Sequence, residues 1–379
     1  MNLVEKSRNW LTSEVFPLWA AQGIDSRNGS FVECLSRSGE AMPAPRRAMV
    51  QARQIYSFAE AGRMGILPKA QAQKIIAAAT DFFIASYSLA HGGFAYSVTP
   101  DGVQVNSHPD LYTQAFALFG LAEAFHITQN PRIKARALEL VDYLQRERRL
   151  PTQGWSELVG AAVAHEANPH MHLYEAAIAW MRVDRDERWH SLASEIDGMC
   201  RAKFIDSATG ALCEHFQNGW EPQRENGNFV WEPGHHCEWA WLMTQYLEVT
   251  KQPVDPVPFA VFRIAEEAGR GKNGVVYDEV WSGGKVKKTS ARFWPQGERV
   301  KAAVALGAHA PEAQRAQFGK AADQALGHLF TYFEGHKPGL WGDVRNEAGV
   351  LEKNDSVKAS SLYHIINAMS EFARLRPSL

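Results

Sequence analysis

The chain alternates long amphipathic runs with short stretches that contain glycine. The segments 46–64, 70–87 and 110–125 each place apolar residues at three- and four-residue spacing. This spacing gathers the apolar side chains on one face of an α-helix, and few segments show the strict alternation that is typical of half-buried strands. The pattern therefore predicts a protein built mainly from helices with one buried face.

The stretches between the helices recur along the whole chain. Each has a glycine followed by a short aromatic or β-branched piece, and successive glycines lie 64, 61, 56, 64 and 65 residues apart. The marker glycines are Gly29, Gly93, Gly154, Gly210, Gly274 and Gly339. A repeat of about 60 residues indicates stacked helical hairpins, and six such units account for the 379 residues.

Six helical hairpins can form either an open solenoid or a closed barrel. An open solenoid needs distinct polar caps at its ends, and the terminal units show none. One helix of each pair carries polar and aromatic residues near its start, as expected if these helices line a central pocket. We therefore expect a single all-α catalytic domain over residues 1–379, an (α/α)6 barrel. The alternative is an irregular all-α protein.

Composition and charge narrow the kind of partner. The chain is 45% hydrophobic with a formal net charge of −2, so neither nucleic acid nor a membrane surface is expected to bind it. No apolar run approaches the roughly 18 residues of a membrane span, and residues 1–16 do not resemble a signal peptide. The four cysteines show no C-x-x-C pairing, which favours a reduced cytoplasmic protein. A small molecule is the expected partner, and a second copy of the chain remains a possible one.

The starts of the predicted inner helices hold most of the residues that could carry chemistry. Polar groups that converge in an aromatic-lined pocket suit a sugar, which presents both hydroxyl groups and C–H faces. The candidates are Arg53, Tyr112, Asn168, His170, His172, Glu175, His235, His236, Glu238, Arg292, Trp294, Gln296, Glu298, Tyr363 and His364.

Helical spacing sorts the histidines. His235 and Glu238 are three residues apart and share a helix face, whereas the adjacent His236 points elsewhere. His172 and Glu175 repeat that spacing. In first turns of helices, with Asn168 as a plausible N-cap, the dipole favours neutral imidazole, the form that a general base needs. We expect a hydrogen-bonded structural role for one of His170 and His236.

A metal site is the alternative interpretation of the same residues. Two H-x-x-E pairs together with His364 could bind a divalent ion. Such sites use additional bridging carboxylates, but other inner helices offer Arg53, Tyr112 and Gln296 instead. We therefore expect no metal.

Four segments resemble those of a known family. "NPHMHLYEA", "WEPGHHCEWAWL", "FWPQGERVKA" and the late "YH" are similar, in this order over essentially the whole chain, to signature segments of the N-acylglucosamine 2-epimerase superfamily. Its sugar-isomerase branch, with D-mannose isomerases and related aldose–ketose isomerases, is most similar. The resemblance implies an (α/α)6 barrel without a cofactor. Two positions depart from the pattern: Leu362, where many members have proline, and Cys237, where phenylalanine is commoner.

The resemblance also implies roles for individual residues. His172, His235 and His364 would surround the sugar, with Glu238 supporting the histidine chemistry and Arg53 polarising the open-chain carbonyl. Tyr112, Asn168 and Trp294 would hold the substrate. The expected substrate-binding set is completed by Glu175, Arg292, Gln296 and Glu298.

The expected reaction is the interconversion of a free aldose and ketose, such as D-mannose and D-fructose, through ring opening and a cis-enediolate. We expect His364 to act at C2, His235 to be the complementary acid or base, and His172 to assist ring opening or hold O1. A sugar 2-epimerase acting on a free or N-acylated hexose, or on a disaccharide end, is the nearest alternative. A glycoside hydrolase would need paired carboxylates about 5–9.5 Å apart, and a non-enzymatic scaffold would not need converging histidines. A phosphorylated sugar remains open, although no glycine-rich phosphate loop is present.

Overall fold

A computed structural model describes residues 2–158 and 165–379, and most of them are helical. The chain forms two compact units. The N-terminal unit comprises residues 12–199 and 358–363, and the C-terminal unit comprises residues 1–11, 200–357 and 364–379. The single domain expected from the repeats stays a prediction.

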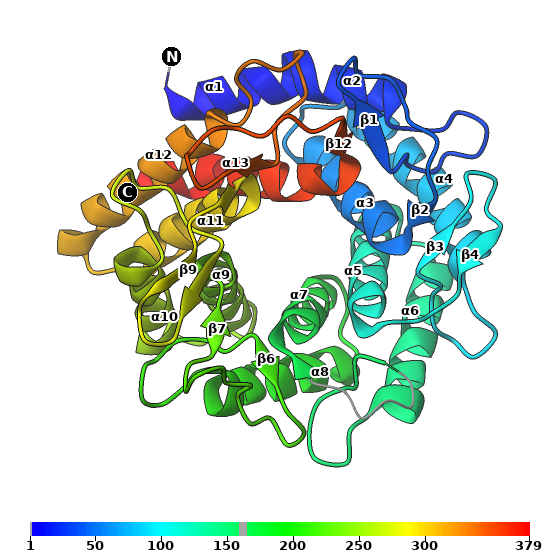
Figure 1. Cartoon of the computed structure of the whole chain (residues 1–379). Helices are drawn as coiled ribbons and strands as arrows, with labels where there is room; N and C mark the ends of the chain where they lie inside the picture. Colours follow the sequence, from blue (N-terminus) through cyan, green and yellow to red (C-terminus); the bar gives the residue numbers. More distant parts are fainter. Residues whose placement is uncertain (1, 159–164) are drawn as a thin grey trace. The chain divides into compact units, whose positions relative to one another are not determined.

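Three helical pairs make up most of the N-terminal unit. The first helices of the pairs, α3, α5 and α7, pack side by side, and α4, α6 and α8 each pack on the preceding helix (Figure 1). The bounds are α2 (Phe16–Gln22), α3 (Ala48–Arg63), α4 (Lys69–Tyr87), α5 (Leu111–Thr128), α6 (Pro131–Tyr143), α7 (Ala167–Val183) and α8 (Glu187–Met199).

The C-terminal unit repeats this arrangement. The first helices α9 and α11 pack against each other, and α10 and α12 pack on them. The bounds are α1 (Leu3–Trp10), α9 (Pro233–Val249), α10 (Pro256–Ala268), α11 (Phe293–His309), α12 (Glu312–Phe330) and α13 (Leu362–Leu375), whose first two residues belong to the N-terminal unit.

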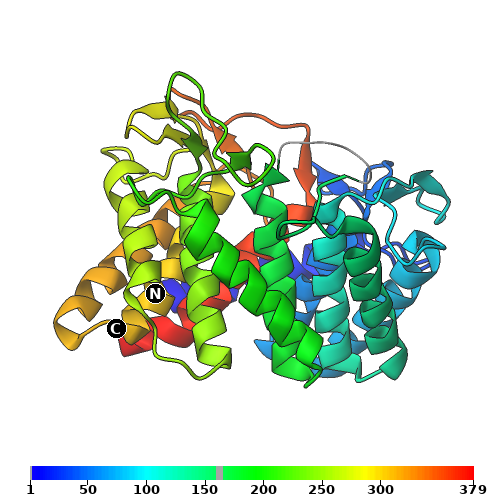
Figure 2. The ribbon, with the colours of Figure 1, turned by 90° about the horizontal axis from the view of Figure 1, so that it is seen from below.

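Short strands lie at one end of the helices within each unit (Figure 2). The antiparallel sheets are β2–β3–β4 in the N-terminal unit, and β7–β8–β9 and β10–β11 in the C-terminal unit. Strands β2, β5, β7 and β10 lead almost directly into α3, α7, α9 and α11, so they fix the starts of these helices. The bounds are β1 (Cys34–Ser36), β2 (Arg46–Arg47), β3 (Ser97–Val98), β4 (Gln104–Asn106), β5 (His165–Glu166), β6 (His215–Phe216), β7 (Val230–Trp231), β8 (Glu279–Trp281), β9 (Val286–Lys288), β10 (Ala291–Arg292), β11 (Val344–Arg345) and β12 (Ser356–Lys358).

The first helices are buried on nearly all faces, because they are covered by their neighbours and by the second helices. All residues from Leu111 to Ala124 except Tyr112 are buried in α5, and all from Pro233 to Leu247 are buried in α9. Small residues allow close approach: a Cβ on Gly120 would lie 2.8 Å from the Cβ of Ala52 on α3. A helix this enclosed has little amphipathic pattern, so its polar residues serve a specific purpose.

One hydrogen-bonding device connects each of these helices to the loop before it. Gln114 accepts from the backbone N–H of Phe94 at 2.7 Å and donates to its carbonyl at 2.9 Å. Gln51 makes the same pair of bonds to Phe31, and Gln296 makes them to Val276. We call this helix position the clamp position; it is occupied by Gln51, Gln114, His170, His236 and Gln296.

Each loop turns at a glycine in the left-handed region, where only glycine is unstrained. Five of these are the marker glycines expected from the sequence, but in the second repeat Gly92, with φ 98°, makes the turn instead of Gly93. No helix among residues 2–158 and 165–379 is long and apolar enough to cross a membrane.

Candidate active site

Three registers are defined by the clamp position. Two residues before it stand Tyr112, Asn168 and Trp294, the three residues expected to hold a substrate, and all three are half-buried. Two residues after it stand Arg53, Phe116, His172, Glu238 and Glu298. In the last repeat Leu362 takes the place equivalent to the clamp position, and His364 stands two residues after it. Three residues further on stand Tyr56, Phe119, Glu175, Trp241, Lys301 and Asn367. Positions three apart share a helix face, so these registers place the polar residues on matching faces.

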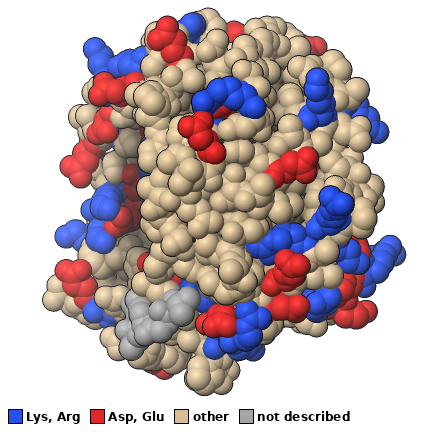
Figure 3. Space-filling model, turned by 90° about the vertical axis from the view of Figure 1, so that its right-hand side faces the viewer, with Lys and Arg blue, Asp and Glu red and all other residues tan. Residues whose placement is uncertain are grey.

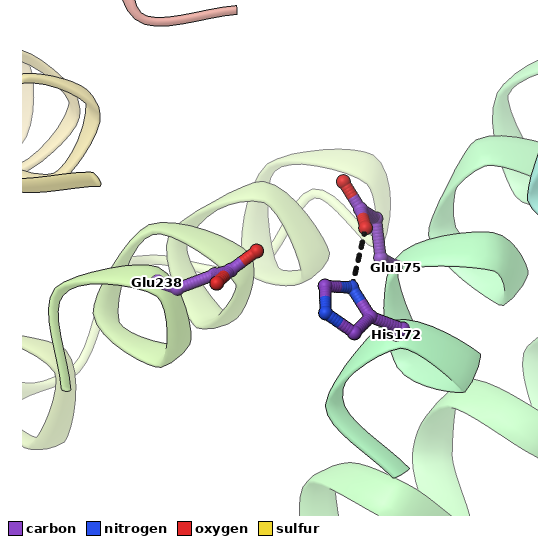
Figure 4. A group of neighbouring side chains, drawn as sticks. All are labelled: His172, Glu175 and Glu238. Carbon is purple, nitrogen blue, oxygen red and sulfur yellow. Dashed lines mark hydrogen bonds and ion pairs between the residues drawn. The ribbon is translucent and has the colours of Figure 1, made fainter. Parts of the chain in front are cut away.

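In the N-terminal unit, His172 and Glu175 form the pair that their spacing predicts. The His172 Nδ1 lies 3.1 Å from the Glu175 Oε2, and the Tyr363 hydroxyl donates to the other carboxylate oxygen. Figure 4 shows the bond between His172 and Glu175 on α7, and it also draws Glu238, which belongs to α9. The imidazole is fixed by the carboxylate and also packs on the Phe116 ring, so it is held in one orientation.

Arg53 is buried among aromatic rings in the same unit. Its guanidinium donates to the Tyr112 hydroxyl at 2.9 Å and lies over the ring of Phe116, 4.3 Å from its centroid. Among the described residues its Nε has no hydrogen-bond partner, and no carboxylate forms an ion pair with it. A buried cation without a counter-ion is costly, and it is suited to binding an oxygen that becomes negative during a reaction.

In the C-terminal unit, His235 is bonded to a carboxylate that the sequence analysis did not single out. Its Nδ1 lies 2.8 Å from the Glu214 Oε2. Burial alone would lower the pKa of His235, but the charges of Glu214 and Glu232 outweigh it and raise this pKa well above its usual range. The ring is therefore an imidazolium at neutral pH. The neutral form expected from the helix dipole is wrong here, because the buried Glu214 carboxylate and the half-buried Glu232 carboxylate act more strongly than the dipole.

Glu214 could have been found from the repeat. In several repeats a carboxylate stands two residues after the loop residue that is bonded to the clamp position. This carboxylate accepts the backbone N–H of the residue that lies four before the clamp position. The pairs are Glu33 with Arg47, Glu157 with Glu166, Glu214 with Glu232, and Asp278 with Arg292. The signal was hidden because these loops differ in length.

His364 makes a second histidine–carboxylate pair in the C-terminal unit. Its Nδ1 lies 2.7 Å from the Glu298 Oε1, and the other oxygen of Glu298 lies 2.6 Å from the Lys301 ammonium. The Trp294 ring lies near both histidines, with centroid distances of 5.1 Å to His235 and 5.6 Å to His364. Because each Nδ1 is held by a carboxylate, Nε2 is the nitrogen of each ring that can exchange a proton with a substrate.

The histidines at the clamp position are both structural, where the sequence analysis expected one. His236 accepts the N–H of Leu212 at its Nε2 and donates from Nδ1 to the Glu232 carbonyl. His170 makes the equivalent bonds to Trp155 and to the Glu166 carbonyl. Burial lowers the pKa of each ring to about 4, so both stay neutral and replace the glutamine of the other repeats.

Three other residues that were expected to bind the substrate make protein contacts or lie at positions that were not predicted. Gln296 is fully buried, and both its amide atoms are bonded to backbone, which supports a clamp role. Arg292 bridges Asp278 and Glu232 at 3.0 and 2.7 Å. Asn168 lies inside α7 and is not its N-cap, which is Glu166; its Oδ1 has no hydrogen-bond partner among the described residues.

Gly234 makes room for Trp294. A Cβ at Gly234 would lie 2.6 Å from two ring carbons of Trp294 and 2.9 Å from the Cβ of Pro295. Pro233 at the first position of α9 fixes the backbone angle there. The segment Pro233–Gly234 therefore sets both the start of α9 and the position of the indole beside His235.

Three buried groups in the C-terminal unit could hold a cation. One ligand atom each from Glu238, Glu298 and His364 lies within 4.8 Å of the others. The Lys301 ammonium already supplies a positive charge at Glu298. The absence of a metal, expected from the sequence, stays a prediction.

The chain matches a known protein family over most of its length. Residues 29–368 match the N-acylglucosamine 2-epimerase (GlcNAc 2-epimerase) family. The chain is 32% identical to a mannose-6-phosphate isomerase from Rhizobium meliloti (strain 1021) over 96% of this chain and 94% of that protein. It also resembles two solved structures, cellobiose 2-epimerase from Bacillus thermoamylovorans B4167 (21% identity, TM-score 0.85, 98% of each chain) and a D-mannose isomerase (18% identity, TM-score 0.85, 98% of this chain and 97% of that one).

These structural likenesses show the fold. The expected fold class is confirmed: the protein is all-α, of the (α/α)6-barrel class. The family match covers the predicted histidine segments from "NPHMHLYEA" to the late "YH". The chain therefore belongs to the N-acylglucosamine 2-epimerase family.

Proposed function

We propose that the protein is an aldose–ketose isomerase, without a cofactor, that interconverts a free sugar such as D-mannose with D-fructose. The observation that carries this proposal is the pair of histidines beside Trp294. His235 is held as an imidazolium by Glu214, and His364 is bonded to Glu298. One acid and one base beside an aromatic surface are what an enediolate mechanism requires, since sugar C–H faces pack on aromatic rings.

In the proposed reaction, His364 Nε2 removes the C2 proton of the open-chain aldose while His235 donates a proton to the carbonyl oxygen O1. The electron pair of the C2–H bond forms the C1–C2 double bond of the enediol. His235 then takes the proton of the O2 hydroxyl, and His364 returns its proton to C1, which gives the ketose. Proton transfers of this kind contribute about 10²–10⁴-fold per well-placed group.

The remaining proposed roles belong to Arg53, His172, Tyr112, Asn168 and Glu238. Arg53, a buried cation with an unbonded Nε, is suited to stabilising negative charge on the sugar oxygens. His172, fixed by Glu175, assists ring opening or holds O1. Tyr112 and Asn168 hold hydroxyl groups. Glu238 remains assigned to the support of the histidines, since its charge adds to those that raise the pKa of His235.

We propose an unphosphorylated substrate, although the Rhizobium meliloti relative is named a mannose-6-phosphate isomerase. A phosphate monoester carries close to two negative charges at neutral pH. Arg292 is engaged by Asp278 and Glu232, and Lys301 is engaged by Glu298. Both of these cations therefore have carboxylate partners that a phosphate would need to displace, and Arg53, which has none among the described residues, is assigned to the sugar oxygens.

The test is incubation of the protein with D-mannose in D₂O, with products identified by NMR. The isomerase should form fructose, and any deuterium should enter C1. Glucose as the only product, with deuterium at C2, would establish the 2-epimerase alternative. Mannose 6-phosphate, N-acetylglucosamine and cellobiose belong in the same panel. Turnover of the phosphate ester alone would overturn the free-sugar proposal, and no turnover of any sugar would overturn the isomerase proposal.

A further inference from the structure

Lys301 is a charged residue that the proposed mechanism does not use. It lies on α11, three residues after Glu298, and both side chains are completely inaccessible to solvent. Its ammonium lies 2.6 Å from the Glu298 Oε2 and 3.8 Å from the centroid of the Trp241 ring on α9. A lysine ammonium is almost never fully buried unless it is paired with a negative group.

Glu298 connects this ammonium to His364. One carboxylate oxygen pairs with Lys301, and the other lies 2.7 Å from Nδ1 of His364 on α13. Glu238 on α9 completes the group, since one of its oxygens lies within 4.8 Å of atoms of Glu298 and His364. Further along α13, Glu371 accepts from the Trp241 indole and pairs with Arg374. The described contacts around His364 therefore include two carboxylates, Glu298 and Glu238, and the ammonium that pairs with Glu298.

The charged groups around His235 differ from those around His364. Glu214, Glu232 and Asp278 form a connected set that contains one cation, Arg292, in addition to the imidazolium. The charge of Glu238 adds to those of Glu214 and Glu232 at His235. Among the described residues no lysine or arginine pairs with Glu214, the carboxylate bonded to His235, whereas Lys301 pairs with Glu298, the carboxylate bonded to His364. Two otherwise similar histidine–glutamate pairs thus differ in the charge that surrounds them.

We propose that Lys301 is a positioning residue that offsets the charge of Glu298, so that His364 releases its proton more readily and serves as the base while His235 serves as the acid. The proposal rests on the proposed function. A positive charge this close to a histidine–carboxylate pair opposes protonation of the ring, and a buried site screens that effect little.

The test compares Lys301→Met with the wild type. Methionine keeps an unbranched apolar stem against Trp241 and removes the charge. The acidic limb of the profile of kcat/KM against pH should move to higher pH by about one unit. Lys320→Met, a substitution of an exposed lysine on α12, should leave the profile unchanged. If Lys301→Met lowers kcat or the melting temperature but leaves the acidic limb in place, Lys301 is only structural and the proposal is wrong.

A second pair of variants keeps the test valid if Lys301→Met does not fold. Glu298→Gln with Lys301→Met removes both buried charges together and restores the wild-type net charge around His364. Its acidic limb should lie about one unit above that of Glu298→Gln alone, because the two differ only in the ammonium. Coinciding limbs in these two variants would contradict the proposal.

Titration of the histidine rings by NMR separates this proposal from the proposed function. The His364 signal is identified by its loss in His364→Gln, and its midpoint is then followed in the wild type and in Lys301→Met. A shift to higher pH in Lys301→Met supports the role of Lys301 even if no sugar is converted. An unshifted His364 signal contradicts it even if the isomerase activity is established.

Discussion

Two adjacent histidines on α9 carry different charges at neutral pH because of their hydrogen-bond partners. His235 faces the Glu214 carboxylate, which together with Glu232 raises the pKa of its ring. His236 faces the backbone of Leu212 and of Glu232, and burial lowers the pKa of its ring to about 4. The same residue type is therefore an acid at one position and a structural hydrogen-bonding group at the next.

This difference predicts opposite outcomes for one substitution. His235→Gln should lower kcat/KM by about 10²–10⁴-fold, because the proposed proton donor is removed. His236→Gln should keep kcat/KM within a few-fold of wild type, because glutamine makes the equivalent bonds in three other repeats. Steady-state kinetics and circular dichroism on both variants check this. Equal losses in both would contradict the assignment.

Glu214 carries a second prediction at the residue scale. Glu214→Gln still accepts the Glu232 N–H but removes the negative charge that stabilises the His235 imidazolium. The pKa of His235 should fall, and since the proposed acid works only while protonated, the alkaline limb of the profile of kcat against pH should move to lower pH.

Glu33→Gln is the matched control for that experiment. Glu33 has the same place in the first repeat, but it is bonded to Arg47 and not to a histidine. Its substitution should lower stability and leave the alkaline limb where it is. An unmoved limb in Glu214→Gln would show that His235 does not supply the proton.

The residue types of the site could be predicted from the sequence, but their pairing could not. Helical spacing pairs His172 with Glu175, and the structure has this bond. The same spacing suggested Glu238 for His235, whereas the bonded carboxylate is Glu214, 21 residues earlier in a loop. Contacts between a helix and a loop depend on the loop's path, which periodicity does not encode.

At the scale of elements, the clamp position explains how short loops stay ordered above buried helices. A buried backbone N–H and carbonyl without partners would cost about 1–3 kcal/mol each. In each of five repeats a side chain of the first helix satisfies the N–H of a buried loop residue: Phe31, Phe94, Trp155, Leu212 and Val276. The helix and its preceding loop therefore form one structural unit.

Loss of the hydrogen bonds made at one clamp position should destabilise the protein more than substitution of an exposed glutamine. Gln114→Leu is nearly isosteric, but it leaves the N–H and carbonyl of Phe94 without their side-chain partner, so we expect a loss of about 2–4 kcal/mol in the free energy of unfolding. Urea denaturation measures this. Gln73→Leu, at an exposed position of α4, should change the same quantity by less than about 0.5 kcal/mol. A Gln114→Leu protein as stable as this control would show that the clamp position does not stabilise the fold.

Periodicity predicted the helical pairs because each second helix keeps one exposed face, as in α6 and α10. The segment 110–125, which becomes α5, was predicted from its spacing of apolar residues, yet the structure buries it on nearly every side. The turn at Gly92 could not be distinguished from Gly93, since adjacent glycines are equivalent in a sequence pattern and only the backbone angle separates them.

At the scale of the whole molecule, basic and acidic residues are nearly balanced in number. The chain has 40 basic and 42 acidic residues, and Figure 3 shows both kinds interspersed on the face it presents. Long-range attraction of a substrate requires an excess of one sign over a surface. Such an excess would be useful for a phosphorylated sugar and irrelevant for a neutral one.

The whole-molecule prediction follows from this distribution. Charges separated by more than about 10 Å are screened at 0.1 M salt, so electrostatic attraction of a dianionic substrate would weaken as salt is added. A neutral sugar is not attracted in this way. The kcat/KM for D-mannose should therefore change by less than about twofold between roughly 0.01 and 0.5 M sodium chloride. The opposite result would be a kcat/KM for mannose 6-phosphate that exceeds the one for D-mannose and falls several-fold as salt is added. That result would indicate that the natural substrate is phosphorylated.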